Sequence, residues 1–421
     1  MKTVSIKSVL SKVSAAPLFL RLSAVFVSTL LSSVLMVKSG HALDDGSIFV
    51  DPSDGFLDAS KYLSENAYGF LPVPIVITDP AVDGGFGLSG VFFHEDESDR
   101  ERRLKALQAN DENAAKYLFT PNVSVVGAAY TGNDSYFVGG GHLGFFNNGR
   151  TRYFGGLGYG SLNLDFYGYG DLTIESPIEL NTEAVFVAQN LKFQISKLPV
   201  FVGFVQRYTN AELSPTNLND IDVERFPEAL QDDLPALLTR EVTTSGFGFT
   251  AQFDNRDNFF SPNQGFQYEL THLWFDDSIG SDFHYQLTEF SGLNFFRLTK
   301  HWRSNIRIES EYAQTQGILP PFATPSVKLR GIPAGRYQGD AIGVVEWELV
   351  YEISPRWEVS AFAGAGRAAE QFSDLSDSPS RVTKGMGFRY MIARRYGFDM
   401  GLDIARGPEE SVFYIQAGSA W

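Results

Sequence analysis

The chain has 421 residues, no cysteine and a formal net charge of −16 at pH 7. The absence of cysteine excludes disulfides and thiolate metal sites, and the acidity argues against nucleic acid as a partner, because proteins that bind it present basic surfaces. Glycine, with 40 residues, and phenylalanine, with 36, are both abundant, which fits the bends and walls of a large β structure.

The first 42 residues predict a cleaved signal peptide. Basic residues up to Arg21 are followed by an uncharged, mostly apolar run at residues 22–37, and Gly40-His41-Ala42 then supplies the small residues of a cleavage site. The alternative is a membrane-anchoring helix, but a spanning helix needs about 20 mostly apolar residues. We therefore predict export, with cleavage near Ala42.

The next part of the chain, residues 43–71, is too short to fold alone and is predicted to be a short periplasmic segment. Residues 71–80 contain three prolines. Because proline cannot donate to a central ladder, we expect an extended lead into a first strand at residues 86–94. Residues 95–114 form a charged stretch that we expect to be locally helical.

From there to the C-terminus, apolar and polar residues alternate with the period of two that predicts β-strands. In the clearest run, Phe398 and Leu402 share an apolar face while Asp399 and Asp403 share a polar face. We count fifteen strands from Phe86 onward. A single-chain bacterial barrel has an even number of strands, so we predict a sixteenth strand hidden within residues 159–177.

The connections between these strands alternate between short and long. Residues 132–134 and 196–199 read as tight turns, because they are rich in glycine, asparagine, serine and proline. Residues 210–241 and 315–340 read as long external loops.

The alternation favours an all-β, transmembrane, antiparallel β-barrel over residues 72–421. No later segment offers 18 consecutive apolar residues, so helical spans are not expected, and a closed barrel is the other structure that can cross a bilayer. A soluble sandwich would alternate in the same way. Strands of about ten residues, charges on the polar faces and aromatic residues near strand ends favour the barrel. We therefore predict a bacterial outer-membrane location, with outer-membrane lipid and lipopolysaccharide as surroundings.

Three sequence elements occur in order along the chain. Residues 82–93 contain Gly-Gly-Phe-Gly-Leu, residues 254–265 carry a polar strand–turn–strand pattern, and residues 329–332 read Leu-Arg-Gly-Ile before Gly339-Asp340-Ala341. Together they resemble the first barrel strand, a conserved turn and the sixth external loop of the BamA/TamA superfamily, also called bacterial surface antigens. The resemblance covers residues 71–421. The turn residues that carry it are Asp254, Arg256, Asp257, Pro262 and Gly265.

The resemblance implies an external lid loop that folds into the barrel. Its tip would be Leu329, Arg330, Gly331 and Ile332, with Arg330 docked on acidic residues of the lumen. Glu348 matches the acidic position of the family strand, and Glu346, Asp399 and Asp403 are further expected partners. Two departures are expected to matter: residues 362–366 lack the aspartate of the family strand motif, and the chain has no room for periplasmic POTRA repeats.

The resemblance also implies a weak seam between the first and last strands. We expect it between residues 86–94 and 412–421, with Gly85 and Gly87 on one side and Phe413 and Trp421 on the other. Glycines make the first strand poor in packing side chains, and an exposed strand edge can pair with an incoming strand.

The predicted function is outer-membrane biogenesis, or the insertion or translocation of a peptide or protein. The alternative is a passive gated pore for small solutes; a stable open conductance would favour the pore, and substrate crosslinks at the seam would favour insertion. An enzyme is not expected, because no nucleophile elbow is present. No histidines have metal-ligand spacing, and the glycine-rich residues 139–144 lie in strand sequence, so no metal and no cofactor are predicted.

Overall fold

The computed structural model describes residues 49–61, 71–94, 122–147, 149–169, 172–216, 240–258, 261–394 and 398–417. The predicted signal peptide with its cleavage site, the charged stretch at 95–114 and Trp421 lie outside these residues. Among the described residues, no helix is long and apolar enough to cross a membrane.

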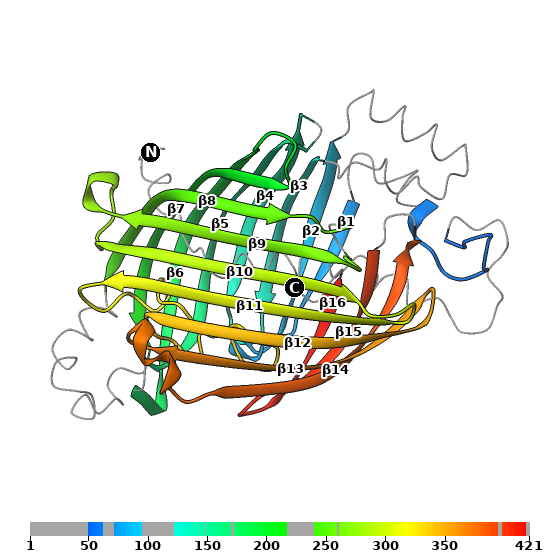
Figure 1. The fold of residues 1–421 in the computed structure, drawn as a ribbon. Helices are drawn as coiled ribbons and strands as arrows, with labels where there is room; N and C mark the ends of the chain where they lie inside the picture. The colour runs from blue at the N-terminus through cyan, green and yellow to red at the C-terminus, as the bar shows by residue number, and fades with distance from the viewer. Residues whose placement is uncertain are drawn as a thin grey trace, which may run out of the picture.

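The described residues form one antiparallel sheet of sixteen strands, in which each strand pairs with its neighbours in sequence. The sheet curls into a barrel, with β9–β12 across the front of Figure 1 and β3–β5 behind. The prediction of an all-β, sixteen-stranded antiparallel barrel is confirmed. The strands are β1 (Leu71–Ile77), β2 (Gly85–His94), β3 (Asn122–Thr131), β4 (Tyr136–Phe146), β5 (Thr151–Tyr169), β6 (Leu172–Gln194), β7 (Val200–Pro215), β8 (Glu241–Asp254), β9 (Gly265–Phe275), β10 (Tyr285–Arg297), β11 (Trp302–Thr315), β12 (Ala341–Ser354), β13 (Trp357–Ala369), β14 (Arg381–Ala393), β15 (Phe398–Arg406) and β16 (Ser411–Ala417), with 3₁₀ helices η2 (Pro80–Val82), η5 (Asp277–Ile279) and η6 (Phe372–Ser376) between them.

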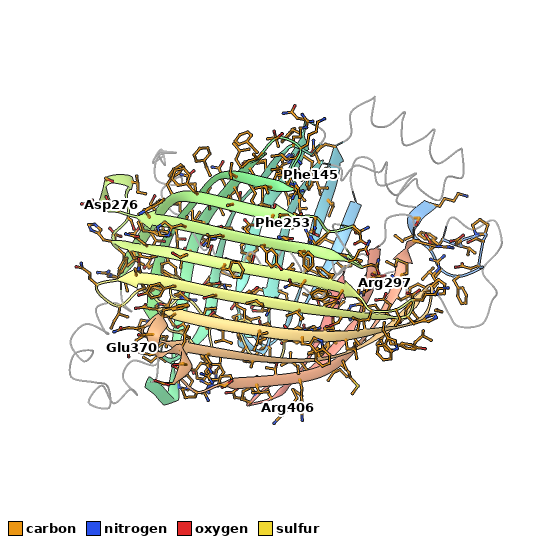
Figure 2. The ribbon with its side chains drawn as sticks, in the orientation of Figure 1. Phe145, Phe253, Asp276, Arg297, Glu370 and Arg406 are labelled. Carbon is orange, nitrogen blue, oxygen red and sulfur yellow. The ribbon has the colours of Figure 1, made fainter. Side chains whose placement is uncertain are left out.

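The two ends of the barrel differ in their connections. At the turn end, β6–β7 and β10–β11 are joined by tight turns; at the loop end, residues 316–340 join β11 to β12. Asp276 and Glu370 mark the loop end and Arg297 the turn end in Figure 2. The predicted turns at 132–134 and 196–199 and the predicted connection at 315–340 are confirmed. The predicted loop at 210–241 was placed too early, because residues 210–215 still belong to β7; residues 217–239 lie outside the described part of the chain.

Side chains alternate between the two faces of the wall, as the sequence predicts. Leu402 is 40% exposed, whereas Asp399 and Asp403 are buried on the opposite face. Val345 and Trp347 likewise point outward. The outer face carries large exposed apolar side chains around the barrel, the surface that lipid would cover; they include Phe86, Leu88, Val126, Val138, Leu157, Phe204, Phe249, Val345, Trp347, Met386, Ile404 and Phe413.

The first strand is not residues 86–94, as predicted, but β1, which pairs with β2 along its whole length. The expectation that residues 71–80 form an unpaired lead was therefore wrong. Proline is excluded from central strands but tolerated on an edge strand, where its missing N–H faces away from the neighbour. Fifteen strands do follow from Phe86 onward, and β1 is the sixteenth; residues 159–177 hold no extra strand, because β5 and β6 form one long hairpin there.

The barrel is nearly closed, with an unsealed seam between β1 and β16. The sheet order runs from β1 to β16, and no ladder joins the described residues of these two strands. Gly85 and Gly87 are therefore not seam residues: they lie in β2, paired with β1 on one side and β3 on the other. Phe413 does lie in the end strand β16.

The prolines of β1 explain why the seam stays unsealed. Pro72 and Pro74 are both paired with β2, so their nitrogen positions must face the seam. Of the three residues that face this side, only Val76 carries an N–H. The seam edge of β1 therefore offers β16 too few donors for a regular antiparallel ladder.

Candidate functional site in the barrel lumen

The segment of residues 316–340 packs against the inner wall of the barrel. Leu319, Val327, Leu329 and Ile332 are each at most 1% exposed. Leu319 joins a cluster with residues of β9 and β10, and the other three join a cluster with Ile342 and Val344 of β12. The segment thus fills part of the space that a wide barrel would otherwise leave open.

Glycines of the wall and of the segment make this close approach possible. A Cβ atom at Gly364 of β13 would lie 2.7 Å from Leu329 Cδ2. Gly331 has a φ of +92°, in the left-handed region, which a residue with a side chain adopts only with strain. Gly364, which lacks a side chain, therefore makes room for the segment.

Arg330 is the polar centre of this contact. Its Nε lies 2.6 Å from Glu346 Oε1, and its Nη1 lies 3.1 Å from Glu348 Oε1 and 2.7 Å from Asp403 Oδ2. Its guanidinium carbon lies 3.5 Å from the ring centre of Phe362. The arginine side chain is 6% exposed, and those of Glu346 and Asp403 are 0% exposed. Charge-assisted pairs this deeply buried are short and directional.

Two further arginines balance the buried acids. Arg389 of β14 donates to both oxygens of Asp403 at 2.5 and 2.9 Å, and Arg307 of β11 lies 3.3 Å from Glu346. Arg307 also lies 3.2 Å from Glu309, so three cations face four anions, and a buried charge is tolerated when it is paired in this way. The sequence placed both arginines on polar strand faces, but nothing in the pattern indicated that they meet the loop.

Asp399, the fourth predicted partner, is not among the described carboxylates that contact Arg330. It lies on the same face of β15, two repeats of the alternation away, and lines a small cavity of about 20 Å³ with Arg303 and Glu358. A space of that size holds about one water molecule. Of the two acidic residues of β15, Asp403 is therefore the one seen in contact with Arg330.

The tip of the segment contacts both sides of the unsealed seam at the loop end. The Gly331 N–H donates to the hydroxyl of Tyr414 in β16 at 2.8 Å. The Ala334 N–H lies 3.5 Å from Asp79 Oδ1, in the connection between β1 and β2. Arg336 lies 3.5 Å from Glu409, which precedes β16. We call these contacts the loop-end bracket.

The predicted strand–turn–strand motif builds the connection between β8 and β9 at the turn end. Asp254 accepts from Arg256 at 3.0 Å and from Arg152 of β5 at 2.9 Å. Asp257 accepts the Asn263 N–H at 2.9 Å. Gly265, with a φ of +110°, starts β9, and Pro262 lines the same small cavity as Glu348. These residues shape the wall and do not touch Arg330 in the described contacts.

Other ion pairs cross the inner face between strands that are not neighbours. Lys192 of β6 lies 2.6 Å from Glu269 of β9, and Arg207 of β7 lies 2.5 Å from Glu289 of β10. The inner charges therefore pair with one another. Among the described residues, Asp276, Asp277 and His284 have ligand atoms close enough for a metal, but they are a largely exposed loop-end trio of a kind that is common without one.

No protein-family model and no curated protein sequence match the chain. The fold is similar to BamA from Haemophilus ducreyi lacking POTRA domains 1–3, at TM-score 0.51 and 12% identity over 83% of this chain and 70% of that chain. It is also similar to CdiB from Acinetobacter baumannii, at TM-score 0.50 and 12% identity over 83% of this chain and 59% of that one. CdiB from Escherichia coli matches at TM-score 0.51 and 9% identity, over 82% and 62%. The chain spans less than two thirds of either CdiB, and the likeness establishes the barrel fold.

Proposed function

We propose that this protein is a bacterial outer-membrane barrel that receives an extended polypeptide segment at the β1–β16 seam and takes part in the insertion or translocation of a peptide or protein. The observation that carries the proposal is the unsealed seam. A strand edge without a partner presents backbone donors and acceptors that another chain can use. In this proposal the predicted signal peptide directs export, and the turn end faces the periplasm.

The two edges of the seam differ in what they offer to an incoming strand. The edge of β1 lacks donors at Pro72 and Pro74, whereas β16, residues 411–417, contains no proline. Every residue of β16 that faces the seam can therefore both donate and accept. We infer that an incoming segment pairs with β16, while β1 moves aside.

The lid is the second part of the proposal. Arg330 is held by Glu346, Glu348 and Asp403. Residues 329–332 would thereby keep the lumen closed while the seam opens to receive a polypeptide segment. The inner charges that a passive pore would use are paired with one another instead. This favours passage at the seam over passage of small solutes through the lumen.

Photocrosslinking tests which edge receives the client. A benzophenone amino acid is placed at Phe413 of β16, at Val76 of β1 and, as a control, at Phe249, which is 52% exposed on β8 far from the seam. Newly made outer-membrane barrel proteins should crosslink most strongly at position 413. Equal yields at 413 and 249 would show that the seam is not the site of contact.

A further inference from the structure

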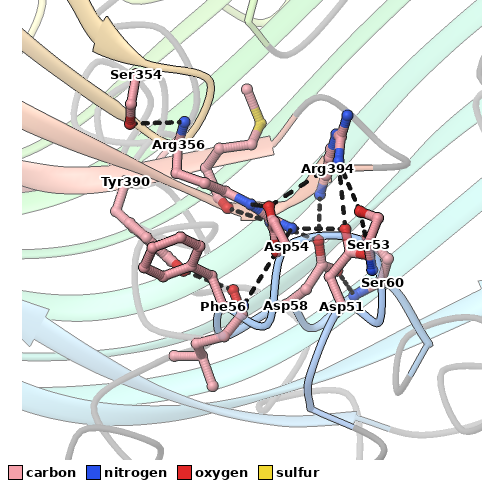
Figure 3. A network of polar contacts seen from close by, with 12 residues as sticks. Asp51, Ser53, Asp54, Phe56, Asp58, Ser60, Ser354, Arg356, Tyr390 and Arg394 are labelled. Atoms are coloured by element: carbon pink, nitrogen blue, oxygen red, sulfur yellow. Dashed lines mark hydrogen bonds and ion pairs between the residues drawn. The ribbon is translucent and has the colours of Figure 1, made fainter. Parts of the chain in front are cut away.

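A strap of the N-terminal chain, residues 49–61, is fixed to the turn end by one arginine. Arg356, in the turn between β12 and β13, binds three aspartates at once (Figure 3). Its Nη2 lies 2.6 Å from Asp51, its Nε 2.7 Å from Asp54 and its Nη1 2.6 Å from Asp58. The arginine side chain is only 2% exposed. We call this arrangement the clamp.

The local sequence folds so that the aspartates converge. The Gly55 N–H donates to the Asp51 carbonyl at 2.8 Å, and Gly55 takes a φ of +72°, which closes a turn in Asp-Pro-Ser-Asp-Gly. Burial alone would raise the pKa of Asp51, but hydrogen bonds from Ser53 and the charges of Arg356 and Arg394 outweigh it and lower the pKa. The carboxylate is thus ionised at neutral pH.

The strap is also tied to the end of β14. The Tyr390 hydroxyl donates to the Leu57 carbonyl at 2.7 Å, and the Ala59 N–H donates to the Ile392 carbonyl at 2.7 Å. The Arg394 N–H donates to Asp58 at 3.2 Å. The strap therefore belongs to the C-terminal side of the barrel, two strands from the seam.

The chain then leads directly to the other side of the seam. Nine residues, 62–70, separate Lys61 of the strap from Leu71, the first residue of β1. The two ladder spacings from β14 to β16 amount to about 10 Å, and β1 lies beyond β16 across the unsealed seam. The ten steps from the Cα atom of Lys61 to that of Leu71 span at most about 35 Å. The connection therefore limits how far β1 can move from β14.

We propose that Arg356 is a positioning residue for the seam: by clamping the strap to the β14 side, it holds the start of β1 beside β16 where no ladder does. The inference rests on the proposed function, in which β1 is the strand that moves away when the seam opens. The loop-end bracket restrains the opposite end of the same seam. Release of the clamp frees β1 at the turn end first, the end at which a periplasmic client would arrive.

Hydrogen exchange of the folded barrel, in lipid nanodiscs and without client, tests this inference. The amides of β1 that can be followed are those bonded to β2, since Pro72 and Pro74 have none. Arg356→Ala should speed exchange of these amides by about tenfold or more, because a β1 strand released at the turn end frays from β2, while amides of β9 and β10 keep their rates. The control is Arg297→Ala, which removes an ion pair to Glu352 at the same end of the barrel. Unchanged β1 exchange, or equal acceleration in every strand, would overturn the proposal.

A disulfide between the strap and β14 shows whether the effect of Arg356→Ala comes from release of the strap or from a general loss of stability. The chain has no native cysteine, so Ala59→Cys with Ile392→Cys in the Arg356→Ala background can form one bond only. Oxidation should restore slow exchange in β1; failure to restore it in the oxidised protein would overturn the role of the strap. Since no client is present, this result is independent of the crosslinking at Phe413, whose failure would count against the proposed function alone.

Discussion

Arg330→Ala is expected to cause the largest loss of stability of any single change in the lumen. The substitution leaves Glu346, Glu348 and Asp403 buried with one cation fewer. Removing one partner of a buried ion pair typically costs about 3–5 kcal/mol. The fraction of barrel that stays compact on semi-native gels should fall at a lower temperature than in the wild type.

The same measurement on Glu348→Gln and on the double variant shows whether the two residues act together. Residues in one network give non-additive effects, so the double variant should lose less than the sum of the single losses. Arg406→Ala is the control, because Arg406 is exposed on the outer face of β15. Strict additivity, or an effect of Arg330→Ala no larger than that of the control, would show that the 316–340 segment is not held to the wall through this arginine.

Leu402→Arg is expected to impair folding into bilayers by a comparable amount. Leu402 lies in the middle of β15 and points outward. An arginine on the lipid face costs about 2–4 kcal/mol at the midplane and about 0–1 kcal/mol near the interfaces. The free energy of unfolding, measured by urea titration in lipid vesicles, should fall by an amount in the first range.

Val382→Arg is the matched control for depth. Val382 is 59% exposed on the outer face but is the second residue of β14, at the loop end, with Lys384 beside it on the same face. Its substitution should cost little. Equal losses for Leu402→Arg and Val382→Arg would contradict a lipid-covered belt at the depth of Leu402.

Periodicity predicted the parts of the fold that depend on local alternation. The outward face of Leu402 and the inward faces of Glu346, Glu348 and Asp403 follow from the period of two, because one face of each strand is buried. The position of β1 did not follow, because Pro72 and Pro74 read as breakers. Proline is compatible with pairing on one side only, and the sequence does not reveal which strands stand at the edges.

The contacts between distant residues could not be predicted from the pattern. Arg356 and Asp51 are separated by 305 positions, and an aspartate-rich turn reads as a solvated loop until its partner is known. The docking of Arg389 on Asp403 joins neighbouring strands, but its link to Arg330 depends on the path of the 316–340 segment. Alternation determines which face of the wall a residue lies on, but it does not determine which residue across the lumen it contacts.

A disulfide across the seam tests most directly whether the protein works by opening between β1 and β16. Val76→Cys with Phe413→Cys, and Pro74→Cys with Ile415→Cys, place outward-facing pairs across the seam, while Leu88→Cys with Ala128→Cys spans the sealed β2–β3 ladder as a control. The measurement is the yield of newly made barrel protein that becomes heat-resistant in vesicles containing each variant. Oxidation should abolish this yield for a seam pair, reduction should restore it, and the control should be unaffected; full yield from an oxidised, crosslinked seam would show that opening of the seam is not how the protein works.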